Sequence, residues 1–95
     1  MKYSFDNNKK AINLAKHGLD FDDAKLVIES DQTLTFEDSR FDYGEQRFIT
    51  IGLLQKTLAV IVTSETENQN ENKVRIISMR KADKHEQAIY YKNIG

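Results

Sequence analysis

The segment RFITIGLLQKTLAVIVTS, residues 47–64, predicts two strands joined by a short turn. Successive side chains of an extended strand point to opposite sides, and residues 47–53 follow that alternation. One face carries Phe48 and Thr50, and the other carries Arg47, Ile49 and Ile51. Because the turn at 54–56 is short, residues 58–64 should pair antiparallel with the first strand. The chain is therefore expected to contain an antiparallel sheet.

Helical patterns precede this hairpin, after a short extended stretch at 3–5. Asp6 is expected to cap a helix over 8–17, and Gly18 should end it because glycine adopts a left-handed backbone without a Cβ clash. The apolar side of this helix is expected to be Ala11, Ile12, Leu14 and Ala15. Asp20 begins a second helix, whose buried stripe should be Phe21, Ala24, Val27 and Ile28.

Further strands and a last helix are predicted around the hairpin. A brief strand at 33–36 precedes it, and a strand at 73–79 follows a polar, Asn-rich excursion at 65–72 that has nothing to bury. A helix over 81–93 closes the chain, with Ala82, Ala88, Ile89 and Tyr90 as inward positions. The fold class is therefore α+β: a short N-terminal strand, two helices, an antiparallel meander of about four strands and a C-terminal helix.

Composition fits one domain over residues 1–95 in a reducing compartment. The length supports a single modest core, and the absence of cysteine excludes disulfides and thiolate metal sites. The two histidines lie far apart in the sequence, so neither a metal site nor a cofactor is expected. The longest apolar run, 58–62, is too short to span a bilayer, and the first ten residues are polar. These features predict a cytoplasmic location and no membrane contact.

The near-zero net charge of −1 hides a segregation of charges along the chain. Residues 20–45 are mostly acidic, whereas residues 73–84 are mostly basic. A near-neutral chain does not coat nucleic acid non-specifically, but it can still hold a local anion site. The acidic stretch would suit a basic protein partner, although a solvated surface is the commoner explanation.

His17 is the first candidate for chemistry. It ends the first helix beside Lys16, where the helix dipole favours a protonated ring. Such a histidine would donate a proton to a leaving group or hold a phosphate. The alternative is that it only caps the last carbonyl groups of the helix. His85, on the last helix, is expected to lie on the surface.

Two further groups of residues carry charge at strand positions. Glu45 and Arg47 are two residues apart, so they leave one face of a strand, either as an ion pair or as a general base beside a phosphate clamp. Arg75 and Arg80 differ in parity, so an unbroken strand would direct them to opposite sides, although a bulge or the end of the strand near Met79 would bring them together. Each would grip phosphate, or form a structural ion pair with Glu45 or Asp83.

The ordered set of these motifs resembles the BrnT family of toxins. The opening signature is Phe5-Asp6, Asn13, Lys16-His17-Gly18, Phe21 and Ala24. The remainder is Gly44-Glu45-Gln46-Arg47, Ile51-Gly52, the strand from Val60 to Thr63, the run from Arg75 to Ala82, Glu86 and Tyr90. The resemblance covers residues 5–90, nearly the whole chain.

This resemblance implies the toxin half of a bacterial type II toxin–antitoxin pair, with a RelE-like fold. Its implied activity is endoribonuclease cleavage that arrests translation and growth. The implied partner is a BrnA-like, DNA-binding antitoxin, through which the complex would contact operator DNA indirectly. The alternative is a catalytically weak or inactive homologue that binds antitoxin and supports operon repression.

Carried over position by position, the resemblance assigns catalysis to His17, Glu45, Arg47 and Arg80. The corresponding substrate-binding residues are Lys16, Arg75 and Lys81. Two departures stand out: residues 65–72 are longer and more acidic than the family's usual short turn, which would hinder RNA on that side, and His85 replaces a more usual basic residue.

Overall fold

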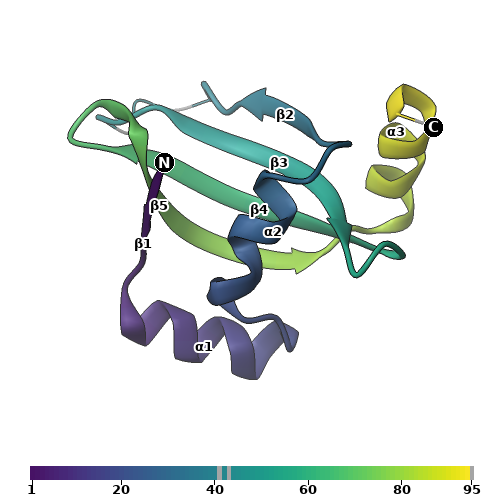
Figure 1. Cartoon of the computed structure of the whole chain (residues 1–95), viewed down its shortest axis with the longest axis horizontal. Helices are drawn as coiled ribbons and strands as arrows, with labels where there is room; N and C mark the ends of the chain where they lie inside the picture. The colour runs from purple at the N-terminus through teal and green to yellow at the C-terminus, as the bar shows by residue number, and fades with distance from the viewer. Residues whose placement is uncertain (41, 43, 95) are drawn as a thin grey trace.

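The computed structural model describes residues 1–40, 42 and 44–94, which form an α+β fold. Its elements are β1 (Lys2–Ser4), α1 (Asn7–His17), the 3₁₀ turn η1 (Phe21–Asp23), α2 (Ala24–Ile28), β2 (Leu34–Glu37), β3 (Arg47–Leu54), β4 (Leu58–Glu67), β5 (Asn70–Lys81) and α3 (Lys84–Ile94). Among the described residues, these strands make one sheet in the order β1-β5-β4-β3-β2 (Figure 1). β2 to β5 are antiparallel neighbours, which confirms the predicted meander, and β1 adds to β5 in parallel.

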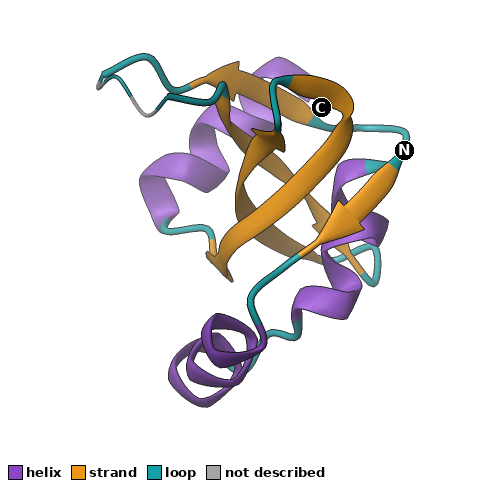
Figure 2. Cartoon of the chain, turned by 90° about the vertical axis from the view of Figure 1, so that its left-hand side faces the viewer, coloured by secondary structure: helices purple, strands orange, loops and turns teal. Residues whose placement is uncertain are grey.

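The helices are divided between the two faces of the sheet (Figure 2). α2 and η1 cover one face with a core that includes Phe21, Val27 and, from the sheet, Val60 and Val62. α3 covers part of the other face, where Tyr90 packs in a second cluster with Ile51 and Ile61. The faces predicted for residues 47–51 are confirmed, since Ile49 and Ile51 both belong to the α3 side.

The glycine in the Ile51-Gly52 step allows α2 to lie close to β3. A Cβ built on Gly52 would be 2.9 Å from the carbonyl oxygen of Val27 and 3.0 Å from its Cγ1. Any larger side chain would push α2 away from the sheet. The glycine is therefore a packing requirement of this fold.

The predicted limits of α1 are confirmed, but its predicted buried side is wrong. Asp6 accepts hydrogen bonds from the N–H groups of Asn8 and Lys9, and Gly18 ends the helix with φ of 69°. However, Ile12 and Leu14 are 65% and 45% exposed.

Asn13 is the residue of α1 that faces the sheet. It is only 7% exposed, and its Nδ2 donates to the Leu19 carbonyl at 3.1 Å. Its Oδ1 accepts from the Met79 N–H, also at 3.1 Å. A polar residue is buried here because the edge of β5 presents an amide that requires a partner.

The predicted polar excursion at 65–72 is also wrong. β4 continues to Glu67 and β5 starts at Asn70, so only Asn68 and Gln69 form the turn, with φ of 54° and 57°. Positive φ at both positions is typical of two-residue hairpins, and asparagine tolerates it well. Glu65 and Thr66 are buried in the strand. The residues form an extended hairpin, and the hindering acidic loop expected from the sequence is absent from this described segment.

The last helix begins later than predicted, at Lys84. Ala82 is buried just before it, and the buried Tyr90 donates its hydroxyl proton to the Gln32 carbonyl at 2.6 Å. Ala88 is exposed, contrary to the prediction, because α3 covers the sheet mainly near its C-terminal end.

Replacing Asn13 by alanine should destabilise the domain by about 2–3 kcal/mol, because a buried N–H and a buried carbonyl both lose their partner. Chemical denaturation measures this loss. Asn8→Ala is the matched control, because Asn8 is exposed on the same helix and only its backbone N–H bonds Asp6. Its effect should stay within about 0.5 kcal/mol. Equal effects of the two variants would contradict the assigned role of Asn13.

Candidate functional site

Arg47 and Arg75 meet at one carboxylate in the middle of the sheet. Arg47 on β3 and Arg75 on β5 both stand opposite Glu65 on the strand between them. Glu65 accepts from Arg47 Nη2 at 3.3 Å and from Arg75 Nη1 at 2.8 Å. Arg75 also lies 3.8 Å from Glu67. Two arginines from separate strands are thus fixed on either side of one carboxylate, and guanidinium groups are suited to binding phosphate.

A β-bulge directs Arg80 to the same face as Arg75. The register between β4 and β5 shifts at Thr63/Ser64, so Arg75 pairs with Glu65 whereas Arg80 pairs with Ile61. Ile61 and Glu65 are four residues apart on β4 and therefore share a face. The bulge considered from the sequence is confirmed, and it removes the parity conflict between the two arginines.

Arg80 is held by a carboxylate of its own. Both of its Nη atoms donate to Glu86 on α3, each at 2.7 Å. These hydrogen bonds lower the pKa of Glu86 to about 2 and raise the pKa of Arg80. The expected alternative partner, Asp83, instead accepts from the Glu86 N–H at 2.8 Å. Arg80 is thus anchored at the junction of β5 and α3.

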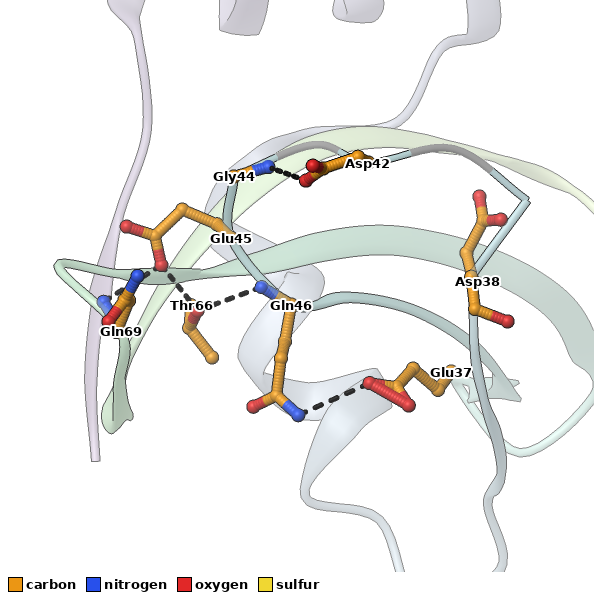
Figure 3. A pocket seen from close by; sticks show the side chains of 9 residues that line it. Glu37, Asp38, Asp42, Gly44, Glu45, Gln46, Thr66 and Gln69 are labelled. Carbon is orange, nitrogen blue, oxygen red and sulfur yellow. Dashed lines mark hydrogen bonds between the residues drawn. The ribbon is translucent and has the colours of Figure 1, made fainter.

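Glu45 lies at the hairpin turn, where it makes structural hydrogen bonds (Figure 3). Its Oε2 accepts from the Thr66 hydroxyl at 2.6 Å and from the Gln69 N–H at 2.8 Å. The Thr66 bond, followed by the Gln69 bond, lowers the pKa of Glu45. A carboxylate with a lowered pKa is a weaker base than an ordinary one.

An acidic recess of about 470 Å³ opens beside Glu45 (Figure 3). Its acidic lining residues are Glu37, Asp38, Asp42 and Glu45. Such a lining repels phosphate and attracts cationic groups. Over the described residues, however, no group of three or more histidines and carboxylates is arranged to hold a metal ion.

His17 and Lys16 lie at a different place, where α1 meets the edge of β5. With Ile12, Ile77 and Ser78 among the other lining residues, they border a shallow recess of about 280 Å³. Within the part of the chain that the structure describes, the side chain of His17 makes no hydrogen bond, so it does not cap the helix. This recess adjoins the bulge in β5, but it includes neither Glu45 nor Arg47.

The remaining cation of the predicted set, Lys81, is exposed at the end of β5. The structure thus brings Arg47 and Arg75 together, adds Arg80 on the same face, and leaves Lys16 with His17 at the strand edge. The sequence interpretation missed Glu65 because it assigned that residue to a loop. Residues 63–67 are all polar and show no apolar alternation, so the β-branched Thr63 and Thr66 were the available signal of a strand.

Comparison with known proteins identifies the family. A family model described as the ribonuclease toxin BrnT of type II toxin–antitoxin systems matches residues 5–86. The chain belongs to the BrnT family. Its fold is similar to the crystal structure of the ribonuclease toxin BrnT of Brucella abortus, with a TM-score of 0.67 and 28% sequence identity. That match covers 88% of this chain and 99% of the Brucella chain.

Comparison with curated protein sequences gives no match. The BrnT assignment confirms the family predicted from the motifs, and with it a ribonuclease toxin of a type II toxin–antitoxin system. Within the described residues, the helices are all too short or too polar to cross a membrane.

The Glu86–Arg80 pair should make stability depend on pH in the acidic range. Because the folded pKa of Glu86 is depressed to about 2, its contribution is present above the unfolded value of about 4.3 and is lost as pH falls toward 2. Glu86→Gln should remove about 1–2 kcal/mol at pH 7, after allowance for solvent screening, and much less at pH 2.

Denaturant titrations at pH 7, 4 and 2 measure this difference. Glu71→Gln is the control, since Glu71 is exposed on the β4–β5 hairpin. A Glu86 effect that stays constant between pH 7 and pH 2 would contradict the pairing.

Proposed function

We propose that this BrnT-family chain is a metal-independent endoribonuclease that cleaves RNA, inhibits translation and arrests growth in the bacterial cytoplasm. The observation that supports it most is the common face of Arg47, Arg75 and Arg80, which follows from the bulge in β5. Guanidinium groups are suited to phosphodiesters because they offer paired N–H donors in a planar fork.

In this mechanism the 2′-oxygen of the substrate attacks the adjacent phosphorus. The new O2′–P bond forms as the P–O5′ bond breaks, which yields a 2′,3′-cyclic phosphate and a 5′-hydroxyl. Negative charge builds on the non-bridging oxygens, where the three arginines stabilise it. A preorganised donor of this kind contributes about 3 kcal/mol to the transition state.

The proton transfers involve the other candidate residues. Glu45 or a neutral His17 would accept the proton of the 2′-hydroxyl, and a protonated His17 or Lys16 would donate one to the leaving 5′-oxygen. The hydrogen bonds that lower the pKa of Glu45 favour His17 as the base of the two. Lys81 follows Arg80 at the end of β5 but pairs with Val60, so it would contact the RNA backbone outside the face that carries Arg80.

The proposed protein partner is a BrnA-like antitoxin that binds DNA and links the complex to its operator. The acidic recess of Glu37, Asp38 and Asp42 supports a basic docking surface on that partner. The sequence predicted such docking from the acidic stretch at 20–45.

A second candidate function is antitoxin binding without RNA cleavage. It is favoured by one observation: Arg47, Arg75 and Arg80 are each paired with a carboxylate of the same chain. Such pairing offsets the local positive charge that attracts RNA. The two functions differ in whether the purified protein cuts RNA.

Cleavage of a defined RNA in EDTA tests the proposed activity. Wild type should cut, and Arg75→Ala and Arg80→Ala should each lower kcat about 10²-fold, because each removes a preorganised donor. Lys92→Ala is the control, since Lys92 is an exposed cation on α3. It should remain within about twofold of wild type. Intact RNA with a folded wild-type protein that still binds antitoxin would favour the second function.

The role of His17 is tested against the other histidine of the chain. His17→Gln should lower kcat about 10²-fold or more, as expected for loss of a general acid or base. His85→Gln, at an exposed position on α3, should leave kcat within about twofold. Equal kcat values for the two variants would remove His17 from the mechanism and leave catalysis to Arg47, Arg75 and Arg80.

A further inference from the structure

Glu65 occupies the centre of the arginine face and contacts both neighbouring strands. Its Oε2 bonds Arg47 Nη2 at 3.3 Å, and its Oε1 bonds Arg75 Nη1 at 2.8 Å. Each carboxylate oxygen therefore fixes a different guanidinium. Because the cross-strand register already places the three residues opposite one another, the contacts follow from the backbone.

The burial of the three side chains differs in a way that matters for substrate access. The side chain of Glu65 is 11% exposed, that of Arg47 25% and that of Arg75 41%. The carboxylate is thus covered, while Arg75 in particular remains open to solvent. A buried carboxylate requires charge pairing, so both guanidinium contacts are retained in the folded protein.

Both arginine side chains keep exposed surface while they bond Glu65, 25% for Arg47 and 41% for Arg75. A guanidinium carries several N–H donors, and each bond to Glu65 is made through an Nη atom. Pairing with the carboxylate and contact with a phosphodiester are therefore compatible. Arginine side chains are flexible when free, and a fixed one has less to reorganise when charge develops on phosphorus.

We propose that Glu65 is a positioning residue that orients Arg47 and Arg75 as one two-guanidinium clamp for the scissile phosphodiester. The proposal rests on the ribonuclease function proposed above. Glu65 acts through the arginines and does not touch the substrate. Both of its carboxylate oxygens are engaged by the guanidinium groups, and its side chain is 11% exposed.

Glu65→Gln tests the role with nearly unchanged shape. It should lower kcat for a defined RNA in EDTA about 10- to 100-fold, because the clamp is no longer fixed. Its Kd for a 2′-deoxy oligonucleotide of the same sequence should be unchanged or tighter, because a negative charge has been removed. A purely structural role would lower the melting temperature without this separation of kcat from Kd, and a competitor role would raise kcat. Either result would overturn the proposal.

Glu67→Gln is the matched control. It removes the same charge two residues further along β4, where the carboxylate lies 3.8 Å from Arg75, compared with 2.8 Å for Glu65. Its kcat should stay within about twofold of wild type. A fall in kcat as large as that of Glu65→Gln would mean that cleavage depends only on the total charge near Arg47 and Arg75. The positioning role would then be rejected.

Order of the guanidinium groups provides a readout that does not depend on activity. In ¹⁵N relaxation of the arginine Nε–H groups, Arg47, Arg75 and Arg80 should all be rigid in wild type. Glu65→Gln should mobilise Arg47 and Arg75 and leave Arg80 rigid, since Glu86 holds it.

The two proposals fail separately. If wild type cleaves no RNA, the ribonuclease function fails, while the relaxation data still decide whether Glu65 positions the pair. If wild type cleaves and Glu65→Gln leaves both arginines rigid, only the positioning role fails. Should Glu65→Gln not fold, mobile Arg47 and Arg75 in wild type would be sufficient to overturn it.

Discussion

The bulge in β5 is the constraint on which both faces of the sheet depend. Ile76 and Met79 are three residues apart, yet both are buried in the core on the α2 side. An unbroken strand would turn one of them outward. The shift at Thr63/Ser64 lets both side chains enter the core, and it returns Arg75 and Arg80 to the opposite face. The bulge between β4 and β5 therefore does two things: it buries Ile76 and Met79 in the core, and it places Arg75 and Arg80 on the same face.

The elements that depend on local rules could be predicted from the sequence. The Asp6 cap, the Gly18 stop and the alternation in 47–53 are set by residues close in the chain. The orientation of α1 could not be predicted, because it depends on an amide at Met79, 66 residues away. Residues 65–72 were misread for a related reason: a polar strand looks like a loop until its cross-strand partners are known.

The candidate site was predictable in its residue types and only partly in its arrangement. Arginines in an apolar strand pointed to an anion site or to ion pairs, and the geometry contains features of both. Glu65 and Glu86 hold the guanidinium groups while leaving them near the surface. The carboxylates fix the geometry of the guanidinium groups and also offset their positive charge, so anion recognition at this face would depend on geometry more than on net potential.

The packing of α1 has a consequence for comparing relatives of this chain. In most surface helices, apolar positions are constrained by the core and polar positions vary. Here Asn13 is the position constrained by folding, whereas Ile12 and Leu14 face outward and contribute little to the interior. If apolar residues persist at those two outward positions across homologues, internal packing would not explain it. Apolar residues retained at these positions would indicate contact with another molecule.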